Sequence, residues 1–221
     1  MKPLPQPLAG VFFDLDGTLV DSARDMHDAL AALCREQGIA VPDFEHVRES
    51  VSRGARAVLR CALGDDEAKV DALLPRFLDL YVATGMANTR AFAGVDALLD
   101  QLEARGIAWG VVSNKAGGLV ALVMEKLGYT RRAAAVVGGD TLAQRKPEPE
   151  PVLHACKLAG VAPAHCAYVG DDPRDILAGR AAGLYTVAAA WGYLDGADPN
   201  AWQPDAIADS AAQIAGWLEP S

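Results

Sequence analysis

The amino-acid sequence predicts an α/β protein built on a doubly wound parallel sheet with an inserted all-helical cap. From about residue 91 onward, short apolar runs alternate with amphipathic helical runs, which is typical of β-α-β units. Because the strand runs are almost wholly apolar, we expect helices on both faces of the sheet. One further strand, within residues 10–16, stands apart near the N-terminus, and a segment with helical periodicity separates it from the others.

This separating segment predicts the cap. Ser22 and Asp25 form an S-x-x-D pattern, which indicates a capping box at a helix start, and Gly38 ends this helix. Two short helical faces follow, and a third helical run is interrupted or started at Pro75. No strand signal occurs within the segment, so we expect it to form helices only.

The expected organisation is a core domain of residues 1–20 and 91–221 and a helical cap domain of residues 21–90. In the second part of the core we expect helices and strands that alternate, except that two strands follow each other near the end. They are helix 95–106, strand 107–113, helix 118–128, strand 133–139, helix 149–160, strand 165–170, helix 173–183, strand 185–192, strand 205–208 and helix 211–218.

The composition narrows the class of protein. The chain has 221 residues, 51% of them hydrophobic, and its formal net charge of −9 argues against nucleic-acid binding, which depends on cationic side chains. The four cysteines form no C-x-x-C pair, so we expect buried free thiols in a reducing compartment. The N-terminus does not resemble a signal peptide and no apolar run is long enough to span a membrane. We therefore expect a cytoplasmic protein without membrane partners, either a monomer or a homodimer.

Side chains that can carry chemistry gather where predicted strands end. Ligands of open parallel sheets bind beyond the carboxyl ends of the strands, so we expect these side chains at one edge of the core. They are Asp14 and Asp16 after the first strand, Ser113 and Asn114 after the second, Lys146 at a helix start, and Asp171, Asp172 and Asp175 after strand 165–170. Carboxylates, a hydroxyl and an ammonium are thus expected at one rim.

This set of groups predicts phosphate chemistry. Clustered carboxylates need a cation, and Mg²⁺ takes one or two carboxylates, keeps water ligands and accepts a phosphate oxygen. Lys146 and Ser113 suit the other side of a phosphate, as a point charge and a hydrogen-bond donor, while Gly17 lets the backbone approach an anion. Phosphoryl transfer through an aspartyl phosphate uses all of these groups.

The motifs resemble those of the haloacid dehalogenase (HAD) superfamily of phosphohydrolases, which has a Rossmann-like core. The match consists of "DLDGT" at residues 14–18, Ser113, Lys146 with Pro147, and "GDDPRD" at residues 170–175, in the family's order. It covers essentially the whole chain, and the insertion after the first motif is similar to the cap of the phosphoglycolate phosphatase-like branch. The resemblance implies a phosphoric monoester hydrolase that uses Mg²⁺ and acts on a small phosphorylated metabolite.

The resemblance also implies catalytic and phosphate-binding roles. Asp14 is expected to be the nucleophile. Asp16 is expected to be the general acid for the leaving alkoxide and later the base for the hydrolytic water. Ser113, Asn114 and Lys146 are expected to bind the phosphoryl oxygens.

The metal ligands that the resemblance implies come from two motifs. They are the side chains of Asp14 and Asp171 and the backbone carbonyl of Asp16. Asp172 is a candidate second ligand, direct or through water, and Asp175 is expected to orient Lys146 or the metal-bound waters.

The cap segment "SRGAR" holds candidate specificity residues. Arg53 and Arg56 flank Gly54, and a substrate with a second anionic group would favour an arginine at this place. The alternative is that both arginines are solvated surface residues. The aromatic segment 190–206 is either a packed surface loop or a lip of the active site.

Several functional hypotheses stay open. The best supported is a phosphatase of the phosphoglycolate phosphatase type. The combination of "RGARA", "GDDPRDI", "WGY" and "NAWQPDA" also resembles the N-acetylmuramic acid 6-phosphate phosphatases. A sugar phosphomutase and a non-catalytic scaffold on the same fold are less favoured, the scaffold because the set of motif residues is complete.

Overall fold

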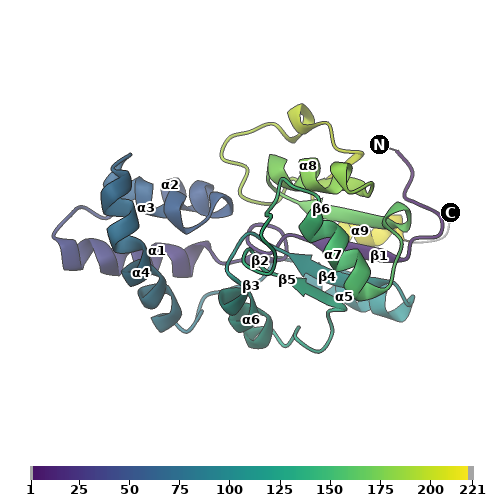
Figure 1. The fold of residues 1–221 in the computed structure, drawn as a ribbon, viewed down its shortest axis with the longest axis horizontal. Coiled ribbons are helices and arrows are strands. Elements are labelled where there is room, and N and C mark those ends of the chain that lie inside the picture. Colours follow the sequence, from purple (N-terminus) through teal and green to yellow (C-terminus); the bar gives the residue numbers. More distant parts are fainter. Residues whose placement is uncertain (1, 219–221) are drawn as a thin grey trace.

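The computed structural model describes residues 2–218 and consists of a sheet-based core with a group of helices beside it (Figure 1). Six parallel strands form one sheet in the order β5-β4-β1-β6-β7-β8. They are β1 (Gly10–Phe13), β4 (Ala108–Val112), β5 (Ala135–Val137), β6 (Cys166–Gly170), β7 (Tyr185–Ala189) and β8 (Ala206–Ala208). The fold class expected from the sequence is confirmed.

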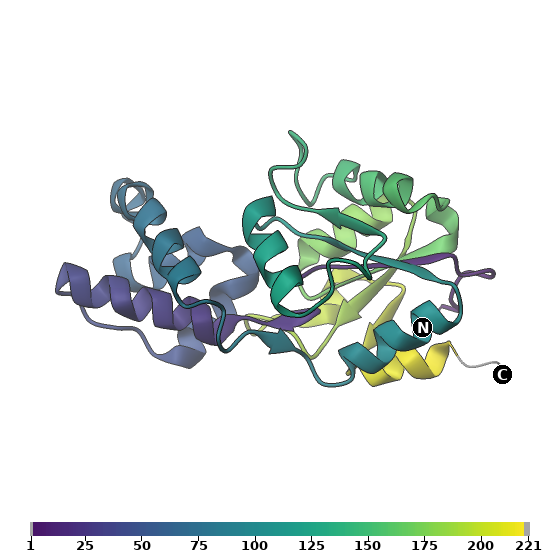
Figure 2. The same cartoon turned by 90° about the horizontal axis from the view of Figure 1, so that it is seen from below.

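Helices cover both faces of this sheet (Figure 2). The core helices are α5 (Val95–Ala104), α6 (Gly117–Lys126), α7 (Glu150–Ala159), α8 (Pro173–Ala181) and α9 (Ala211–Trp217). On one face, α7 packs against β4 and β5, and α8 packs against β6 and β7. On the other face, α5 and α9 pack against each other and against β4 and β8.

Strand β1 lies in the middle of the sheet, and its side chains are buried on both faces. Phe12 packs into one hydrophobic cluster, whereas Val11 and Phe13 pack into the other. Burying each large apolar side chain contributes about 1.5 to 3 kcal/mol, which anchors the strand firmly. The next residue, Asp14, still donates its backbone N–H to Val169 of β6 over 2.9 Å. The first motif therefore begins at a well-fixed point in the centre of the sheet.

Four helices lie apart from the sheet, beyond the end of β1 (Figure 1). They are α1 (Ala23–Gln37), α2 (Phe44–Ser50), α3 (Ala55–Leu63) and α4 (Glu67–Ala83), with a 3₁₀ turn at Val51–Arg53 between α2 and α3. The chain enters and leaves this group side by side, because β2 (Val20–Asp21) pairs antiparallel with β3 (Arg90–Ala91). We call these helices and their connections the cap; the domain boundaries at residues 20 and 91 stay a prediction.

The capping box expected at the start of α1 is wrong. Ser22 is the N-cap residue of α1, but its side chain makes no capping hydrogen bond and donates to Asp16 instead. Asp25 accepts hydrogen bonds from the backbone N–H of Asn88 over 3.1 Å and from the Thr89 hydroxyl over 2.7 Å. Both side chains are buried where the cap joins the core, so partners distant in sequence replace the local ones.

Helix α4 is neither interrupted nor started at Pro75, because it runs from Glu67 to Ala83 through that residue. Proline removes one backbone hydrogen bond of the helix. The helix nevertheless continues because Val70, Phe77 and Tyr81 lie on its buried face, and α4 packs against α1 and α3. Packing thus decides the outcome here over local propensity.

The cysteines agree in part with the expected buried free thiols. All four cysteines are free thiols; three are buried and Cys61 is half-buried. Within residues 2–218, no helix combines the length and the apolar character needed to cross a membrane.

Candidate active site

The residues predicted for the site meet at the carboxyl edge of the sheet. Asp14 follows β1, Ser113 follows β4 and Asp171 follows β6, and these three strands are neighbours. Lys146 reaches the same place from the loop before α7. A cleft of about 360 Å³ opens here between the core and the cap, and Asp14, Asp16, Ser113 and Lys146 line it.

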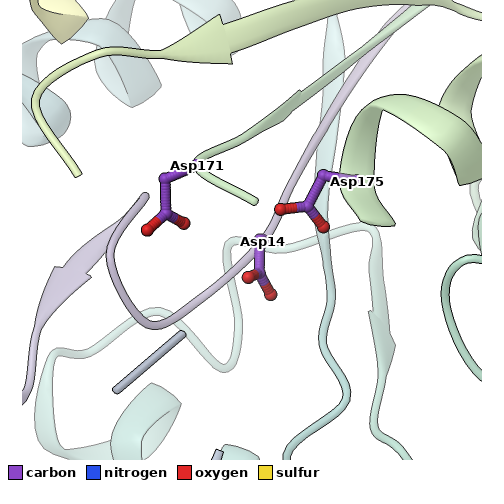
Figure 3. A group of neighbouring side chains, drawn as sticks. All are labelled: Asp14, Asp171 and Asp175. Carbon is purple, nitrogen blue, oxygen red and sulfur yellow. The ribbon is translucent and has the colours of Figure 1, made fainter. Parts of the chain in front are cut away.

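Three buried carboxylates converge beside this cleft (Figure 3). Oxygens of Asp14, Asp171 and Asp175 all lie within 4.8 Å of one another. Burial raises the pKa of Asp171, and the charges of Asp14 and Asp175 raise it further. Burial likewise raises the pKa of Asp175 to about 7, although Lys146 opposes the shift. Holding all three as carboxylates therefore costs free energy that a bound cation would offset.

Lys146 supplies one cation to this group. Its Nζ lies 2.8 Å from Asp14 Oδ1 and donates to Asp175 Oδ1 over 2.7 Å. Its side chain is 3% exposed. Burial by itself lowers the pKa of Lys146, but Asp14 and Asp175 raise it by more, so the ammonium stays charged. The contact with Asp175 is the one expected from the sequence for a residue that orients Lys146.

Asn114 holds the main chain of Lys146 in place. Its side-chain amide donates to the Lys146 carbonyl over 2.9 Å and accepts from the Lys146 backbone N–H over 3.0 Å. The neighbouring Ser113 hydroxyl accepts from the Lys115 backbone N–H over 3.2 Å and faces the cleft. The expected phosphate contacts of Ser113 and Asn114 stay predictions, and the structure adds a positioning contact for Asn114.

Asp171 is held by three hydrogen-bond donors. The Thr18 hydroxyl donates to Oδ1 over 2.8 Å, and the Ser52 hydroxyl and the Tyr193 backbone N–H donate to Oδ2 over 2.6 and 2.9 Å. Gly17 has a φ of +88°, and a Cβ at this position would overlap the Asp171 carboxylate. In the first motif, Gly17 thus leaves room for the Asp171 carboxylate and Thr18 binds it. Ser52 and Tyr193 carried no sequence signal for this role.

The carboxylate group fits a hard divalent cation. Asp14 Oδ1 is buried, and the Lys146 ammonium lies 2.8 Å from it. One ammonium shared by Asp14 and Asp175 does not balance the charges of three neighbouring carboxylates, so a further cation would stabilise them. With the oxygens of Asp171 and Asp175 close by, the donor set is all oxygen, which suits Mg²⁺ better than a soft metal.

Asp172 lies outside this group of three. Both of its oxygens bind the Arg174 guanidinium, over 2.7 and 2.8 Å, and Oδ1 also caps helix α8 by accepting from the Arg174 backbone N–H. Asp175 Oδ2 in turn accepts from the Asp172 backbone N–H over 3.1 Å, which completes a capping box. In this arrangement Asp175, rather than Asp172, presents an oxygen to Asp14 and Asp171.

Asp16 has partners that the sequence did not predict. Lys115 Nζ lies 3.0 Å from Asp16 Oδ1 and 3.1 Å from Oδ2, and the Ser22 hydroxyl also donates to Oδ1. The available signal was the position of Lys115 directly after Ser113 and Asn114, because a residue next to the second motif has to lie near the cleft.

The two cap arginines line the cleft but differ in their partners. Arg53 Nη1 lies 3.1 Å from Asp195 Oδ2, and half of its side chain is exposed. Arg56 is held by two carboxylates of α4, at 2.6 Å from Asp71 and 3.2 Å from Glu67. Arg53 Nη2 also donates to the Ser50 hydroxyl over 2.9 Å, so Arg53 is held by one carboxylate and one hydroxyl, and Arg56 by two carboxylates.

The first residues of the aromatic segment 190–206 pack against the first motif. Trp191 Nε1 donates to the Thr18 carbonyl over 3.0 Å. The Tyr193 hydroxyl donates to Asp21 Oδ1 over 2.7 Å and accepts from the Ser22 backbone N–H over 2.9 Å. Together with the contact between Arg53 and Asp195, these bonds place the segment between the first motif and the cap.

Known proteins with similar sequences support the resemblance found in the motifs. The chain is 46% identical over 215 residues to the phosphoglycolate phosphatase of Xanthomonas campestris pv. campestris (strain 8004), which covers 95% of this chain and 97% of the relative. It is 38% identical over 210 residues to the N-acetylmuramic acid 6-phosphate phosphatase of Pseudomonas aeruginosa, and this match covers 94% of this chain and 93% of the relative.

A solved structure and a family model agree with these relatives. A crystal structure described as a predicted phosphoglycolate phosphatase from Haemophilus somnus 129PT superposes with a TM-score of 0.86 at 25% identity, and the match covers 96% of this chain and 98% of that one. The model of the haloacid dehalogenase-like hydrolases matches residues 11–189, which include every motif of the site. The chain therefore belongs to the family of haloacid dehalogenase-like hydrolases.

Proposed function

We propose that this protein is a Mg²⁺-dependent phosphomonoester hydrolase that acts on a small phosphorylated metabolite through an aspartyl phosphate. The observation that carries the proposal is the pairing of Asp14 with Lys146, 2.8 Å apart and buried beside a cleft. A buried carboxylate next to an ammonium is ready to attack an anionic phosphate, because the ammonium offsets the repulsion between the two anions.

In the first half of the proposed reaction, Asp14 attacks the phosphorus atom. A bond forms between a carboxylate oxygen of Asp14 and phosphorus, and the bond from phosphorus to the ester oxygen breaks. The leaving oxygen keeps the electron pair and takes a proton from Asp16. Ser113 and Lys146 bind the phosphoryl oxygens meanwhile, with Asn114 holding the main chain of Lys146.

In the second half, a water molecule hydrolyses the aspartyl phosphate. Its oxygen bonds to phosphorus, its proton passes to Asp16, and the electron pair of the breaking bond returns to the Asp14 carboxylate. Inorganic phosphate leaves and the enzyme regains its starting state.

The residues that would hold Mg²⁺ are the side chains of Asp14, Asp171 and Asp175, together with the backbone carbonyl of Asp16. Their support is the cluster of three carboxylates, whose charges the single ammonium of Lys146 does not balance. When bound, the cation would offset negative charge on the phosphoryl oxygens. Thr18, Ser52 and the Tyr193 backbone hold Asp171 in place for this task.

Phosphoglycolate is the first candidate substrate. The phosphoglycolate phosphatase of Xanthomonas campestris shares 46% identity with this chain, which is more than the other relative named above shares. The cleft favours N-acetylmuramic acid 6-phosphate as a second candidate. The cleft has a volume of about 360 Å³, which lies within the range of about 300 to 1,000 Å³ found for pockets that bury drug-sized ligands. Apolar side chains also line it, namely Met26, Val51, Leu74, Leu78 and Leu119. An amino sugar with acetyl and lactyl methyl groups uses such a wall, whereas glycolate does not.

The cap completes the proposal. We assign residues 21–90 as a cap domain that closes over the leaving group, since Met26, residues 51–56, Leu74 and Leu78 of this block line the cleft together with the motif residues. A cytoplasmic location and the lack of nucleic-acid and membrane partners also stay proposals, supported by the acidic composition.

One experiment tests the reaction and the substrate together. Purified protein is assayed for phosphate release from both candidate substrates with Mg²⁺, and kcat/KM is compared. Asp14→Asn should abolish turnover while the circular dichroism spectrum stays unchanged, and the exposed Asp79→Asn serves as the matched control. Normal turnover by Asp14→Asn would refute the mechanism.

A second assay separates acid from nucleophile. Asp16→Asn should still release the phenol of p-nitrophenyl phosphate in a first burst, because this leaving group needs little protonation. The same variant should fail on an alkyl phosphate. Equal losses in the burst on both substrates would contradict the role of Asp16.

A further inference from the structure

Lys115 forms an ion pair with Asp16 at the edge of the cleft. Its Nζ contacts both carboxylate oxygens, at 3.0 and 3.1 Å. The side chains of Lys115 and Asp16 are only 6% and 10% exposed. The Ser22 hydroxyl is a second donor to Asp16 and binds Oδ1. Two donors on one carboxylate fix both its position and the plane of its oxygens.

The same ammonium also binds the cap. Lys115 Nζ donates to the Tyr81 hydroxyl oxygen over 3.0 Å and lies 4.6 Å from the centroid of the Tyr81 ring. Tyr81 is fully buried and belongs to α4, whereas Lys115 follows β4 in the core. Lys115 therefore connects a carboxylate of the first motif with a helix of the cap.

The charge of Lys115 is maintained by these contacts. Burial by itself lowers the pKa of Lys115, but Asp16 and Tyr81 raise it by more, so the side chain stays an ammonium. A buried ammonium is costly unless its partners are well placed, and removing one member of such a pair is more harmful than replacing both. The site thus contains two buried ion pairs, one between Lys115 and Asp16 and one between Lys146 and Asp14.

The contacts of Asp16 fix where its oxygens lie. The Lys115 ammonium contacts both oxygens, and the Ser22 hydroxyl also binds Oδ1. A carboxylate that receives a proton from a water molecule depends on such placement, because its oxygen has to lie within hydrogen-bond reach of that water.

We infer that Lys115 is a positioning residue for Asp16 in the hydrolysis of the aspartyl phosphate, and that Tyr81 ties this function to the cap. The inference rests on the proposed function. In this step the water oxygen bonds to phosphorus and the bond from phosphorus to Asp14 breaks, with its electron pair returning to that carboxylate. The water proton passes to Asp16. Lys115 takes no part in bond making; it aims the oxygen that receives the proton.

Pre-steady-state kinetics with p-nitrophenyl phosphate test this inference. The burst of nitrophenol reports phosphorylation of Asp14, and the steady state reports its hydrolysis. Lys115→Met keeps the aliphatic stem and removes the charge. Its steady-state rate should fall by about 10- to 100-fold, a usual cost of losing a residue that orients a functional group. Its burst rate should stay within about threefold, and the phosphorylated protein should accumulate in intact mass spectra after acid quenching.

Two further variants make the result specific. Lys126→Met removes an exposed lysine of α6 and should leave both phases unchanged. Tyr81→Phe removes only the hydroxyl that contacts Lys115, so it should cause a smaller accumulation of phosphorylated protein in the same direction. If Lys115→Met does not fold, Tyr81→Phe decides the matter by the same readout.

The outcomes separate this inference from the proposed function. Equal losses in burst and steady state, or an unchanged steady state in folded Lys115→Met, would overturn the role of Lys115 while the phosphatase assignment stands. Absence of any phosphomonoester hydrolysis by the wild-type protein would instead remove the proposed function itself.

Discussion

Lys146 Nζ lies 2.8 Å from Asp14 Oδ1, so the first and third motifs meet in one buried ion pair. The pair sits where the central strand β1 ends, and Asn114 holds the lysine from the neighbouring strand end. This ion pair is the centre of the site, because Asp175 shares the same ammonium and Asp171 lies beside both carboxylates.

The stability of the protein should depend on this lysine. Lys146→Met leaves Asp14 and Asp175 buried without their cation, and we expect the free energy of unfolding to fall by about 3 to 5 kcal/mol. Urea unfolding without metal measures the change. Lys157→Met, at an exposed position of α7, is the matched control and should alter stability by less than about 0.5 kcal/mol. Equal stability of the two variants would mean that the ion pair contributes nothing.

Gly17 should be required for the shape of the metal-ligand loop. Gly17→Ala places a methyl group against Asp171 in addition to straining a backbone with a φ of +88°. Gly38→Ala is the matched control, because Gly38 also has a positive φ but no atom of the described residues lies within 4 Å of its added Cβ. The control should lose about 1 kcal/mol of stability from backbone strain alone. Gly17→Ala should lose more, together with Mg²⁺ affinity and turnover; matching losses in both variants would exclude the clash.

Mg²⁺ affinity should rise with pH. In the metal-free protein, burial raises the pKa of Asp175 to about 7, so most of this carboxyl group carries a proton at about pH 6. A cation has to displace this proton and also a proton on Asp171, whose pKa is raised by burial too, so affinity should weaken by roughly tenfold per pH unit for each proton displaced as the pH falls through about 7. Titration calorimetry in two buffers of different ionisation enthalpy counts the protons released. Identical affinities at about pH 6 and pH 8 would contradict a ligand role for Asp175.

The two cap arginines should differ in their effect on specificity. Arg53→Ala should lower kcat/KM for the native substrate by about tenfold and leave p-nitrophenyl phosphate nearly unchanged, because the arginine would contact only the leaving group. Arg56→Ala should alter the ratio of the two values by less than about twofold, since Glu67 and Asp71 already hold this arginine. A ratio that stays constant in both variants would place the specificity site elsewhere, in the rest of the cap or in segment 190–206.

Local patterns were sufficient for the fold class and for the choice of candidate residues. The apolar strand that runs into "DLDGT" is readable without a partner, because burial on both faces requires an almost wholly apolar strand. The β-α-β alternation then predicts where the strands end, and hence that Asp14, Ser113 and Asp171 lie on one edge. That Pro75 lies inside α4 could not be read in this way, because packing against α1 and α3 outweighs the missing hydrogen bond.

The sequence by itself determined the parallel sheet, the helical insertion and the family, since these follow from periodicity and from motifs that are continuous along the chain. Only the tertiary structure decided which carboxylates face one another. Asp175 turns toward Asp14 because it lies in the first turn of α8, while Arg174 holds both oxygens of Asp172. Only the tertiary structure brought Lys115, Tyr81 and Ser22 around Asp16 as well. Such contacts depend on the direction of each side chain and on how the cap docks, and no local pattern of residues encodes either.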